Sequence, residues 1–390
     1  MKTTVSCLCL ALLVSHPAFS AFADERIQIN GFGSIVGATT LDDEKPYFGY
    51  DDNIDFKNES LFGLQVRADM GANLSATAQI LARGAEDHEA EFEWAYLTYT
   101  FNNQWTVKAG RFRTPFFEYS DTIDVGYTYH WVRPPKFVYV PLFNNLDGIN
   151  VTYSSPIGQF DSTLDFFYGS VRETIPLGEV DLEYVAGGSW RIGVDWIGMR
   201  FSYFRSELSI PPILPGLTEI LPADPDAPST APPSTGPTVS AEVAEAIRAK
   251  NDVGTFGSIS LRVDYQNAFL IAEITKSRIE ESAFEDPLAY YISTGYTFNQ
   301  FTPHLTFEVF DTKPKTEILD MVPNSDPVRS ELESLLDQTD QDNTVITLGV
   351  RYDFHHSACL KFDVSKVDYD KGGPSRIDTK LFSTAISFVF

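Results

Sequence analysis

The stretch TVITLGVRYDFHHSACLKFDVSKVDY, residues 344–369, indicates the fold class of the chain. In its first half, apolar side chains stand at every second position from Ile346 to Phe354, with threonine, glycine, arginine and aspartate between them. A period of two places one set of side chains on each face of a β-strand. The pattern breaks at His355-His356, and strand-type sequence resumes directly afterwards. We therefore predict two strands joined by a tight turn.

Similar segments recur through the chain and predict an all-β protein. Of its 390 residues, 14% are aromatic and only three are cysteine, which argues against disorder and against a disulfide scaffold. The formal charge of −25 argues against duplex nucleic acid as a partner. The longest apolar run, Leu8–Val14, is far shorter than the roughly 20 residues of a membrane-spanning helix. The sixteen predicted strands cover residues 26–38, 60–70, 73–83, 90–101, 104–112, 146–154, 160–169, 188–197, 199–208, 255–265, 267–278, 288–298, 301–311, 344–354, 357–369 and 378–390.

The connections between these strands alternate in length. After even-numbered strands they are short, as at Gly71-Ala72 and Asn102-Asn103. After odd-numbered strands they are longer and cover residues 39–59, 84–89, 113–145, 170–187, 209–254, 279–287, 312–343 and 370–377. A soluble sandwich has no reason to alternate in this way, whereas an outer-membrane barrel has tight turns at one rim and extended loops at the other. We predict one antiparallel, sixteen-stranded transmembrane β-barrel over residues 24–390.

The two ends of the chain agree with an outer-membrane location. Residues 1–23 combine Lys2, a short apolar core and the small-residue cleavage motif Ala21-Phe22-Ala23, which is typical of a signal peptide. At the other end, Phe390 is the last residue of a strand whose aromatic and apolar residues share one face. Many other aromatic residues stand near the ends of the predicted strands, where a barrel carries its aromatic girdles. We expect the bacterial outer membrane, after cleavage of the signal peptide.

Two external connections are unusually long. The 209–254 loop is rich in proline, which prevents a regular strand ladder. The 312–343 loop carries Val328, Leu332, Leu335 and Leu336 at helical spacing. Two interpretations remain open for these loops, a gate over the pore or a packed surface cap.

The connection at residues 113–145 carries the chemistry. It holds more aromatic residues than a freely solvated loop needs, so we expect it to pack on the barrel wall. Its charged residues, with Arg111 at the end of the preceding strand, either set up a transverse field in a narrow pore or pair with one another and tie the loop down. These candidate constriction residues are Arg111, Arg113, Glu118, Asp121, Asp124, Arg133 and Lys136.

Strand parity predicts which charged residues line the lumen. The basic candidates are Arg67, Arg83, Lys108, Arg191, Arg200, Arg262, Arg351 and Lys361. The acidic candidates are Asp69, Glu91, Glu93, Asp165, Asp195, Asp264, Glu273, Glu308, Asp353 and Asp363. The wall is therefore mixed, and much of the negative charge falls in the outer loops. Those acidic loops either bind divalent cations that bridge lipopolysaccharide or are simply solvated.

Three motifs carry a resemblance to a known group. GRFRTPFFEYSD (110–121), HWVRPPKFVY (130–139) and NLDGINVTYSS (145–155) resemble the Gram-negative outer-membrane porin superfamily that includes the DcaP-like and phosphate-selective (O and P type) porins. The opening Gly31-Phe32-Gly33 and the terminal Phe390 agree with it, whereas the two long loops fall outside it. The resemblance implies a homotrimeric channel whose third external loop folds inward, and diffusion of small, often anionic solutes.

The chain departs from that group in two respects. Phosphate-selective members carry a ladder of lumen lysines, whereas parity gives only Lys108 and Lys361 here. The small number of lumen lysines argues against strict phosphate selectivity. DcaP-type members also have a helical N-terminal extension, which we do not expect here because the first predicted strand begins near Arg26.

No motif indicates catalysis. The chain contains neither G-x-S-x-G nor H-E-x-x-H, and His355-His356 has too few neighbouring ligands for a metal site. We expect no enzyme, no metal and no cofactor. The leading hypothesis is passive diffusion of small hydrophilic solutes, with a weak preference for anions and small carboxylates, next to outer-membrane lipid and lipopolysaccharide. The alternatives are a gated uptake channel for hydrophobic substrates and a closed structural barrel or adhesin.

Overall fold

The fold is known from a computed structural model. It describes residues 26–390 except 42–45, 140–142, 176–177, 211–238, 241–242, 245–246, 248, 281, 283–284 and 371–375. The signal peptide predicted at residues 1–23 lies outside the described residues. Within the described part of the chain, no helix combines the length and the apolar character that crossing a membrane requires.

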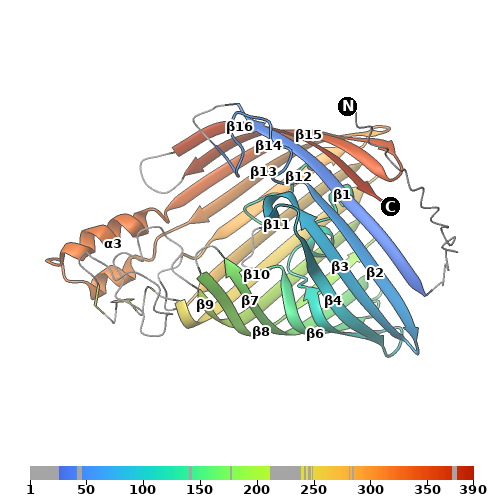
Figure 1. Cartoon of the computed structure of the whole chain (residues 1–390), viewed down its shortest axis with the longest axis horizontal. Coiled ribbons are helices and arrows are strands. Elements are labelled where there is room, and N and C mark those ends of the chain that lie inside the picture. Colours follow the sequence, from blue (N-terminus) through green and yellow to red (C-terminus); the bar gives the residue numbers. More distant parts are fainter. Residues whose placement is uncertain are drawn as a thin grey trace, which may run out of the picture.

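Sixteen antiparallel strands form one closed barrel in chain order, and β1 pairs with both β2 and β16 (Figure 1). The predicted number of strands, their direction and the closure are confirmed. The strands are β1 (Ile27–Thr40), β2 (Leu61–Gly71), β3 (Leu74–Arg83), β4 (Ala90–Thr100), β5 (Trp105–Arg113), β6 (Asn145–Ser154), β7 (Asp161–Ile175), β8 (Gly178–Val194), β9 (Ile197–Ile210), β10 (Ala249–Tyr265), β11 (Ala268–Ile279), β12 (Leu288–Tyr296), β13 (Phe301–Thr312), β14 (Gln341–His355), β15 (Ala358–Asp370) and β16 (Arg376–Val389).

The two ends of the chain close the barrel at its short-turn rim. Gly31 and Phe390 exchange main-chain hydrogen bonds of 2.8 and 2.9 Å. The Phe390 ring lies over Gly31, where a Cβ would collide with it. A glycine is therefore required at this position for the terminal aromatic ring to cover the β1–β16 seam.

The predicted long connection at residues 170–187 is wrong. β7 and β8 continue their pairing as far as Ile175 and Gly178 and form an extended hairpin, so β8 begins ten residues earlier than predicted. Arg172 of β7 pairs with Asp181 of β8 at 2.7 Å. Such charged residues look like a loop by composition. Here they alternate with buried apolar residues, Val171 of β7 and Val180 and Leu182 of β8, so one face of the hairpin still packs in the hydrophobic core.

The two faces of the barrel differ sharply. Large apolar side chains such as Leu97, Ile149 and Leu348 are exposed on the outer face. Serine and threonine side chains such as Ser260, Ser293 and Thr306 are buried on the opposite, inner face. Exposed aromatic residues gather beside the short turns, as an interfacial girdle requires. They are Tyr99, Phe101, Trp105, Trp196, Tyr265, Tyr296, Phe298, Phe301, Phe354 and Phe390.

The described parts of the β9–β10 and β13–β14 connections build a small lobe at the opposite end of the barrel from the short turns (Figure 1). The β13–β14 connection contains the 3-10 helix η4 (Thr316–Met321) and the helix α3 (Pro327–Asp337), which occurs where helical spacing predicted it. Asp326 caps α3 by accepting a 3.0 Å hydrogen bond from the N–H of Val328. Residues of both long connections share one apolar core, which includes Val243, Ile247, Leu332 and Leu336.

Candidate functional site

The β5–β6 connection, residues 114–144, contacts strands far from its own anchors. It contains two short 3-10 helices, η2 (Ser120–Thr122) and η3 (Gly126–Thr128). Its residues hydrogen-bond to side chains of β9, β10, β11, β12, β13, β14, β15 and β16, whereas its anchoring strands neighbour only β4 and β7. We call residues 114–144 the lumen segment.

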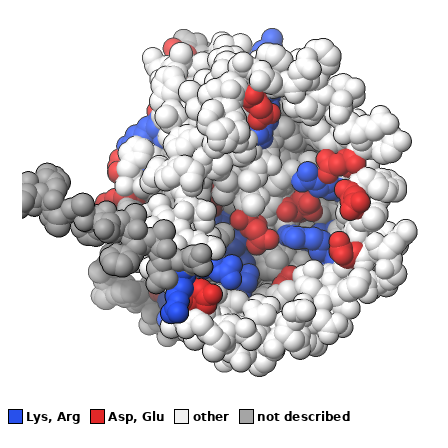
Figure 2. All heavy atoms as spheres, turned by 90° about the vertical axis from the view of Figure 1, so that its right-hand side faces the viewer, with Lys and Arg blue, Asp and Glu red and all other residues white. Residues whose placement is uncertain are grey.

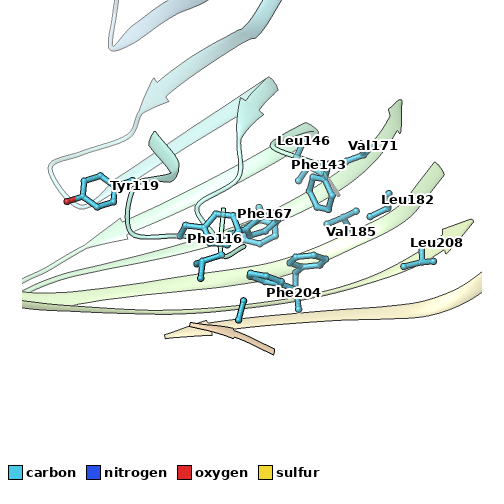
Figure 3. Packing of buried hydrophobic residues seen from close by; sticks show 14 of the residues in the cluster. Phe116, Tyr119, Phe143, Leu146, Phe167, Val171, Leu182, Val185, Phe204 and Leu208 are labelled. Atoms are coloured by element: carbon cyan, nitrogen blue, oxygen red, sulfur yellow. The ribbon is translucent and has the colours of Figure 1, made fainter. Parts of the chain in front are cut away.

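Aromatic packing holds the first part of the lumen segment. Phe116 is buried and stacks on Phe204 of β9, with ring centroids 4.6 Å apart. Phe143, near the other end of the segment, meets Phe116 edge to face at 5.2 Å. Figure 3 shows these rings together with Phe167 of β7 in one cluster. The expectation that these aromatic residues need a surface to pack on is met by the barrel wall.

Hydroxyl groups of the wall hold the middle of the segment. The indole N–H of Trp131 donates a 2.7 Å hydrogen bond to Oγ1 of Thr306 on β13. The Nε2 atom of His130 lies 2.8 Å from Oγ of Ser293 on β12. Because both rings are buried, these bonds replace the water that their polar atoms would otherwise need.

Three buried carboxylates of the wall accept main-chain N–H groups of the segment. Asp363 accepts from Val132 at 2.8 Å. Glu273 accepts from Glu118 at 3.0 Å, and Glu308 accepts from Phe137 at 2.5 Å. Parity placed these acids on the inner face, but the structure covers them with the segment. They satisfy the backbone of an irregular stretch that has no strand partner.

Three basic residues that parity placed in the lumen donate hydrogen bonds to main-chain oxygens of the segment. Lys361 donates to Gly126 and Trp131, and Arg351 donates to Tyr127 at 2.6 Å and Tyr129 at 3.0 Å. Arg200 donates to the carbonyl oxygen of Phe117. Arg351 and Lys361 also lie directly opposite each other on β14 and β15.

A buried charge cluster ties the segment to β3, β4 and β5. Arg113 contacts Glu93 at 2.7 Å and Asp124 at 2.5 Å, and Arg83 reaches the same two carboxylates at 2.9 and 3.2 Å. Burial alone would raise the pKa of Asp124, but the positive charges of Arg113 and Arg83 and their hydrogen bonds hold it below its ordinary value. Two of the candidate constriction residues, Arg113 and Asp124, are thus engaged with partners.

A second latch joins the lumen segment to the β1–β2 loop. Arg133 contacts Glu59 at 2.5 Å, and Lys136 lies 3.4 Å from the same carboxylate. Burial alone would raise the pKa of Glu59, but the Arg133 charge and hydrogen bonds, with Lys136 and Tyr50, lower it to about 2. A cavity of about 380 Å³ lies beside this latch and is also lined by Arg83 and Asp124. Sequence reasoning missed Glu59, because no local pattern marks a loop residue whose partner is 74 positions away.

The structure does not bring Arg111 together with the other basic candidates. Arg111 stands opposite Ala95 and Asp147, so it shares a face with the exposed apolar residues Leu97 and Ile149. Its guanidinium makes a two-point contact with Asp147, at 3.1 and 3.0 Å. Arg111 therefore lies on the outer face of the barrel.

The remaining candidates line the lumen near the short turns. Figure 2 shows side chains of both charges within the opening at that end. Asp121 of η2 is 56% exposed and lies 3.6 Å from Arg191 of β8. Arg262 pairs with Asp264 on its own strand, at 2.5 Å. Arg67 is exposed. The Nζ atom of Lys108 lies 5.4 Å from the centre of the Tyr96 ring. Glu118 accepts a hydrogen bond from Ser260.

Comparison with known proteins gives a family match over part of the chain. Residues 55–125 match the family model described as phosphate-selective porin O and P. A comparison with curated protein sequences gives no match.

Solved structures share the fold at low sequence identity. Salmonella typhi OmpF in complex with daunomycin has a TM-score of 0.59 and 10% identity, over 95% of this chain and 99% of that one. The anion-selective porin from Comamonas acidovorans gives 0.56 and 11%, over 93% and 99%. The outer-membrane channel DcaP of Acinetobacter baumannii gives 0.52 and 10%, over 94% and 98%.

The barrel therefore has the fold of outer-membrane porins, and one segment of the chain matches a porin family model. The resemblance to the outer-membrane porin superfamily that the sequence motifs indicated is confirmed. The closed barrel and the family match also indicate the bacterial outer membrane as its location.

Proposed function

We propose that this protein is a channel through which small hydrophilic solutes diffuse across the outer membrane, and that the lumen segment folds inward to narrow it. One observation carries the proposal. The segment's main chain is hydrogen-bonded to inner-wall side chains such as Asp363, Glu273 and Lys361. A segment fixed at so many points of the wall narrows the lumen without depending on the long outer loops.

The proposed selectivity is a weak preference for anions, with small carboxylates as the cargo. Arg113 and Arg133 are engaged with acids, so the cations that solutes meet are the more exposed ones. These include Lys136, whose side chain is 34% exposed, and Arg191 and Arg262 near the short turns. Charges at a narrow point with low-dielectric walls act more strongly than charges in the outer loops that are exposed to bulk water and screened by salt.

The proposed assembly is a homotrimer in outer-membrane lipid. Its support is a hollow of about 390 Å³ on the outer face of β2–β5, where small side chains replace the bulky ones found elsewhere. The outer-face residues that line it are Val66, Ala68, Ala76, Ala78, Ala95, Leu97 and Ala109. Small side chains allow two barrels to approach closely. The trimer is tested by the mass of the protein in mild detergent. We propose neither a cofactor nor an enzymatic activity.

The channel itself is tested in a planar lipid bilayer. The purified protein is folded in detergent, its barrel is verified by heat-modifiable gel mobility, and it is added to one side of the bilayer. We expect stepwise conductance. In a salt gradient, we expect the sign of the reversal potential to be that of an anion-selective channel. A folded barrel that gives no steps would support the closed structural barrel instead, and a conductance that only hydrophobic solutes block would support the uptake channel.

A further inference from the structure

Two arginines face each other across neighbouring strands of the lumen wall. Arg191 of β8 and Arg200 of β9 are directly paired in register. Like charges directly opposite each other destabilise a sheet, so this arrangement needs a compensating negative charge. Arg200 is buried and donates to the Phe117 carbonyl oxygen, whereas the side chain of Arg191 is 53% exposed to the lumen.

A third arginine extends the pair onto the next strand. Arg200 stands opposite Ser260 of β10, and Arg262 is two residues further along the same face. Arg262 is therefore a diagonal neighbour of Arg200, about 7–8 Å away by sheet geometry. Its side chain is 43% exposed and is held by Asp264. The three arginines stand on adjacent strands, three or four residues from the short turns at Asp195-Trp196 and Gln266-Asn267.

The compensating charge comes from the lumen segment and is held loosely. Asp121 lies 3.6 Å from Arg191 and 3.9 Å from Arg200. These distances exceed the 2.7–3.2 Å of a good N–H···O bond, so the two contacts are ion pairs without a hydrogen bond. By contrast, Asp124, three residues later, contacts Arg113 at 2.5 Å and is largely buried. The segment thus carries one carboxylate that braces it and one that is exposed and weakly held.

We propose that Arg191, Arg200 and Arg262 form an oxyanion-binding station on the short-turn side of the lumen segment, and that Asp121 occupies it as a tethered carboxylate until a solute displaces it. The inference rests on the proposed channel function and deepens it. Asp121 shows the chemistry of the ligand, because one oxygen of its carboxylate lies near the guanidinium groups of both Arg191 and Arg200. Inorganic phosphate shares this chemistry. The neighbouring acids Asp264 and Glu118 keep the binding weak, as release into the periplasm requires.

The test uses two variants with opposite expected signs. Arg191→Gln removes the exposed cation, and Asp121→Asn removes the tethered competitor while keeping the size of the side chain. The matched control is Arg172→Gln, which changes an exposed arginine at the outer end of β7 that is likewise paired with a carboxylate. Chloride current through single channels is measured with succinate or inorganic phosphate added to the short-turn side at constant ionic strength.

For Arg191→Gln we expect block by succinate to weaken about fivefold and the reversal potential to shift toward cations. For Asp121→Asn we expect tighter block and a shift toward anions, and Arg172→Gln should match the wild type. Equal block by phosphate would assign the station to oxyanions in general, and stronger block by succinate would assign it to carboxylates. Shifts of the same sign in both variants, or none in either, would overturn the station and leave the channel intact.

A second measurement does not need conductance. Binding to the folded state raises the unfolding temperature, so succinate should stabilise the wild type in detergent relative to chloride at matched ionic strength. The stabilisation should grow in Asp121→Asn and disappear in Arg191→Gln. A wild type that is stabilised but does not conduct would contradict the proposed channel while supporting the station. A wild type that conducts but is not stabilised by succinate would support the proposed channel and contradict the station.

Discussion

Asp363 of β15 accepts a 2.8 Å hydrogen bond from the main-chain N–H of Val132, which precedes it by 231 positions. The other oxygen of Asp363 lies 3.2 Å from His304 of β13, and a Cβ at Gly349 on the strand between them would collide with both side chains. The wall is thus shaped around this carboxylate. Its role is to supply an acceptor to a buried main-chain N–H that has no strand partner.

The first prediction removes that acceptor. Asp363→Ala should lower the free energy of unfolding by about 1–3 kcal/mol, because a buried N–H loses its partner. It should also increase the open-channel current noise, since the lumen segment loses one anchor. Asp363→Asn keeps an acceptor oxygen and should retain most of the stability. Unfolding in detergent and single-channel recording measure both effects, and equal losses in the two variants would contradict the role of the acceptor.

The second prediction concerns acid. The pKa of Glu59 is lowered from its ordinary value of 4.5 to about 2, which corresponds to ~3 kcal/mol of stability from its ionised form. Because the folded-state pKa is the lower one, this contribution is complete above about pH 4.5 and is lost as the pH falls toward 2. Glu59→Gln should be less stable than the wild type at neutral pH, and the difference should shrink across that window. Urea unfolding at a series of pH values measures it.

The control for the acid prediction is Glu89→Gln, in the exposed β3–β4 connection. This variant should follow the wild-type curve, because Glu89 is not part of the latch to Arg133. A difference between Glu59→Gln and the wild type that does not change between pH 7 and pH 2 would show that the latch contributes by packing and not by charge.

The barrel could be predicted from sequence because lipid on one side and water on the other impose a period of two. That pattern gave the sixteen strands and the short turns, and it placed Arg200, Arg351 and Lys361 on the inner face. It could not predict that the lumen segment covers them, since this depends on contacts between residues more than 80 positions apart. The pattern also failed at the β7–β8 hairpin, where charged residues such as Arg172 and Asp181 obscure the alternation of the buried Val171 and Leu182.

Arg111 shows a different limit of the sequence argument. It stands in the motif GRFRTP beside Arg113, and a constriction loop with both residues looked plausible from charge alone. The preceding Gly110 has a φ of +127°, which alters the path of the strand just before the loop begins. Which face Arg111 occupies is settled by its register with Ala95 and Asp147. Strand parity agrees with this, because Arg111 is three residues from Lys108, which parity places on the inner face.

The third prediction tests the aromatic anchor. Phe116→Ala should lower the free energy of unfolding by about 3–5 kcal/mol, because the ring is buried among Phe143, Phe204 and Phe256 and its loss leaves a cavity. Phe298→Ala truncates an exposed ring beside a short turn and should change the unfolding free energy far less. The loss of stability is measured by unfolding in detergent. A Phe116 variant as stable as the Phe298 variant would mean that the segment is held by its hydrogen bonds alone.

The last prediction separates the two basic residues that sequence reasoning grouped together. Lys136 is partly exposed beside the cavity at the Glu59 latch, whereas Arg111 pairs with Asp147 on the outer face. Lys136→Gln should shift the reversal potential in a salt gradient toward cations, because a charge beside the proposed constriction acts through a low dielectric. Arg111→Gln removes the same unit of charge on the far side of the wall and should leave the reversal potential unchanged. The shift for Lys136→Gln should also shrink as the salt concentration rises, since screening weakens it. An equal shift in both variants would indicate that the net charge of the barrel, and not a local field at the constriction, sets the selectivity.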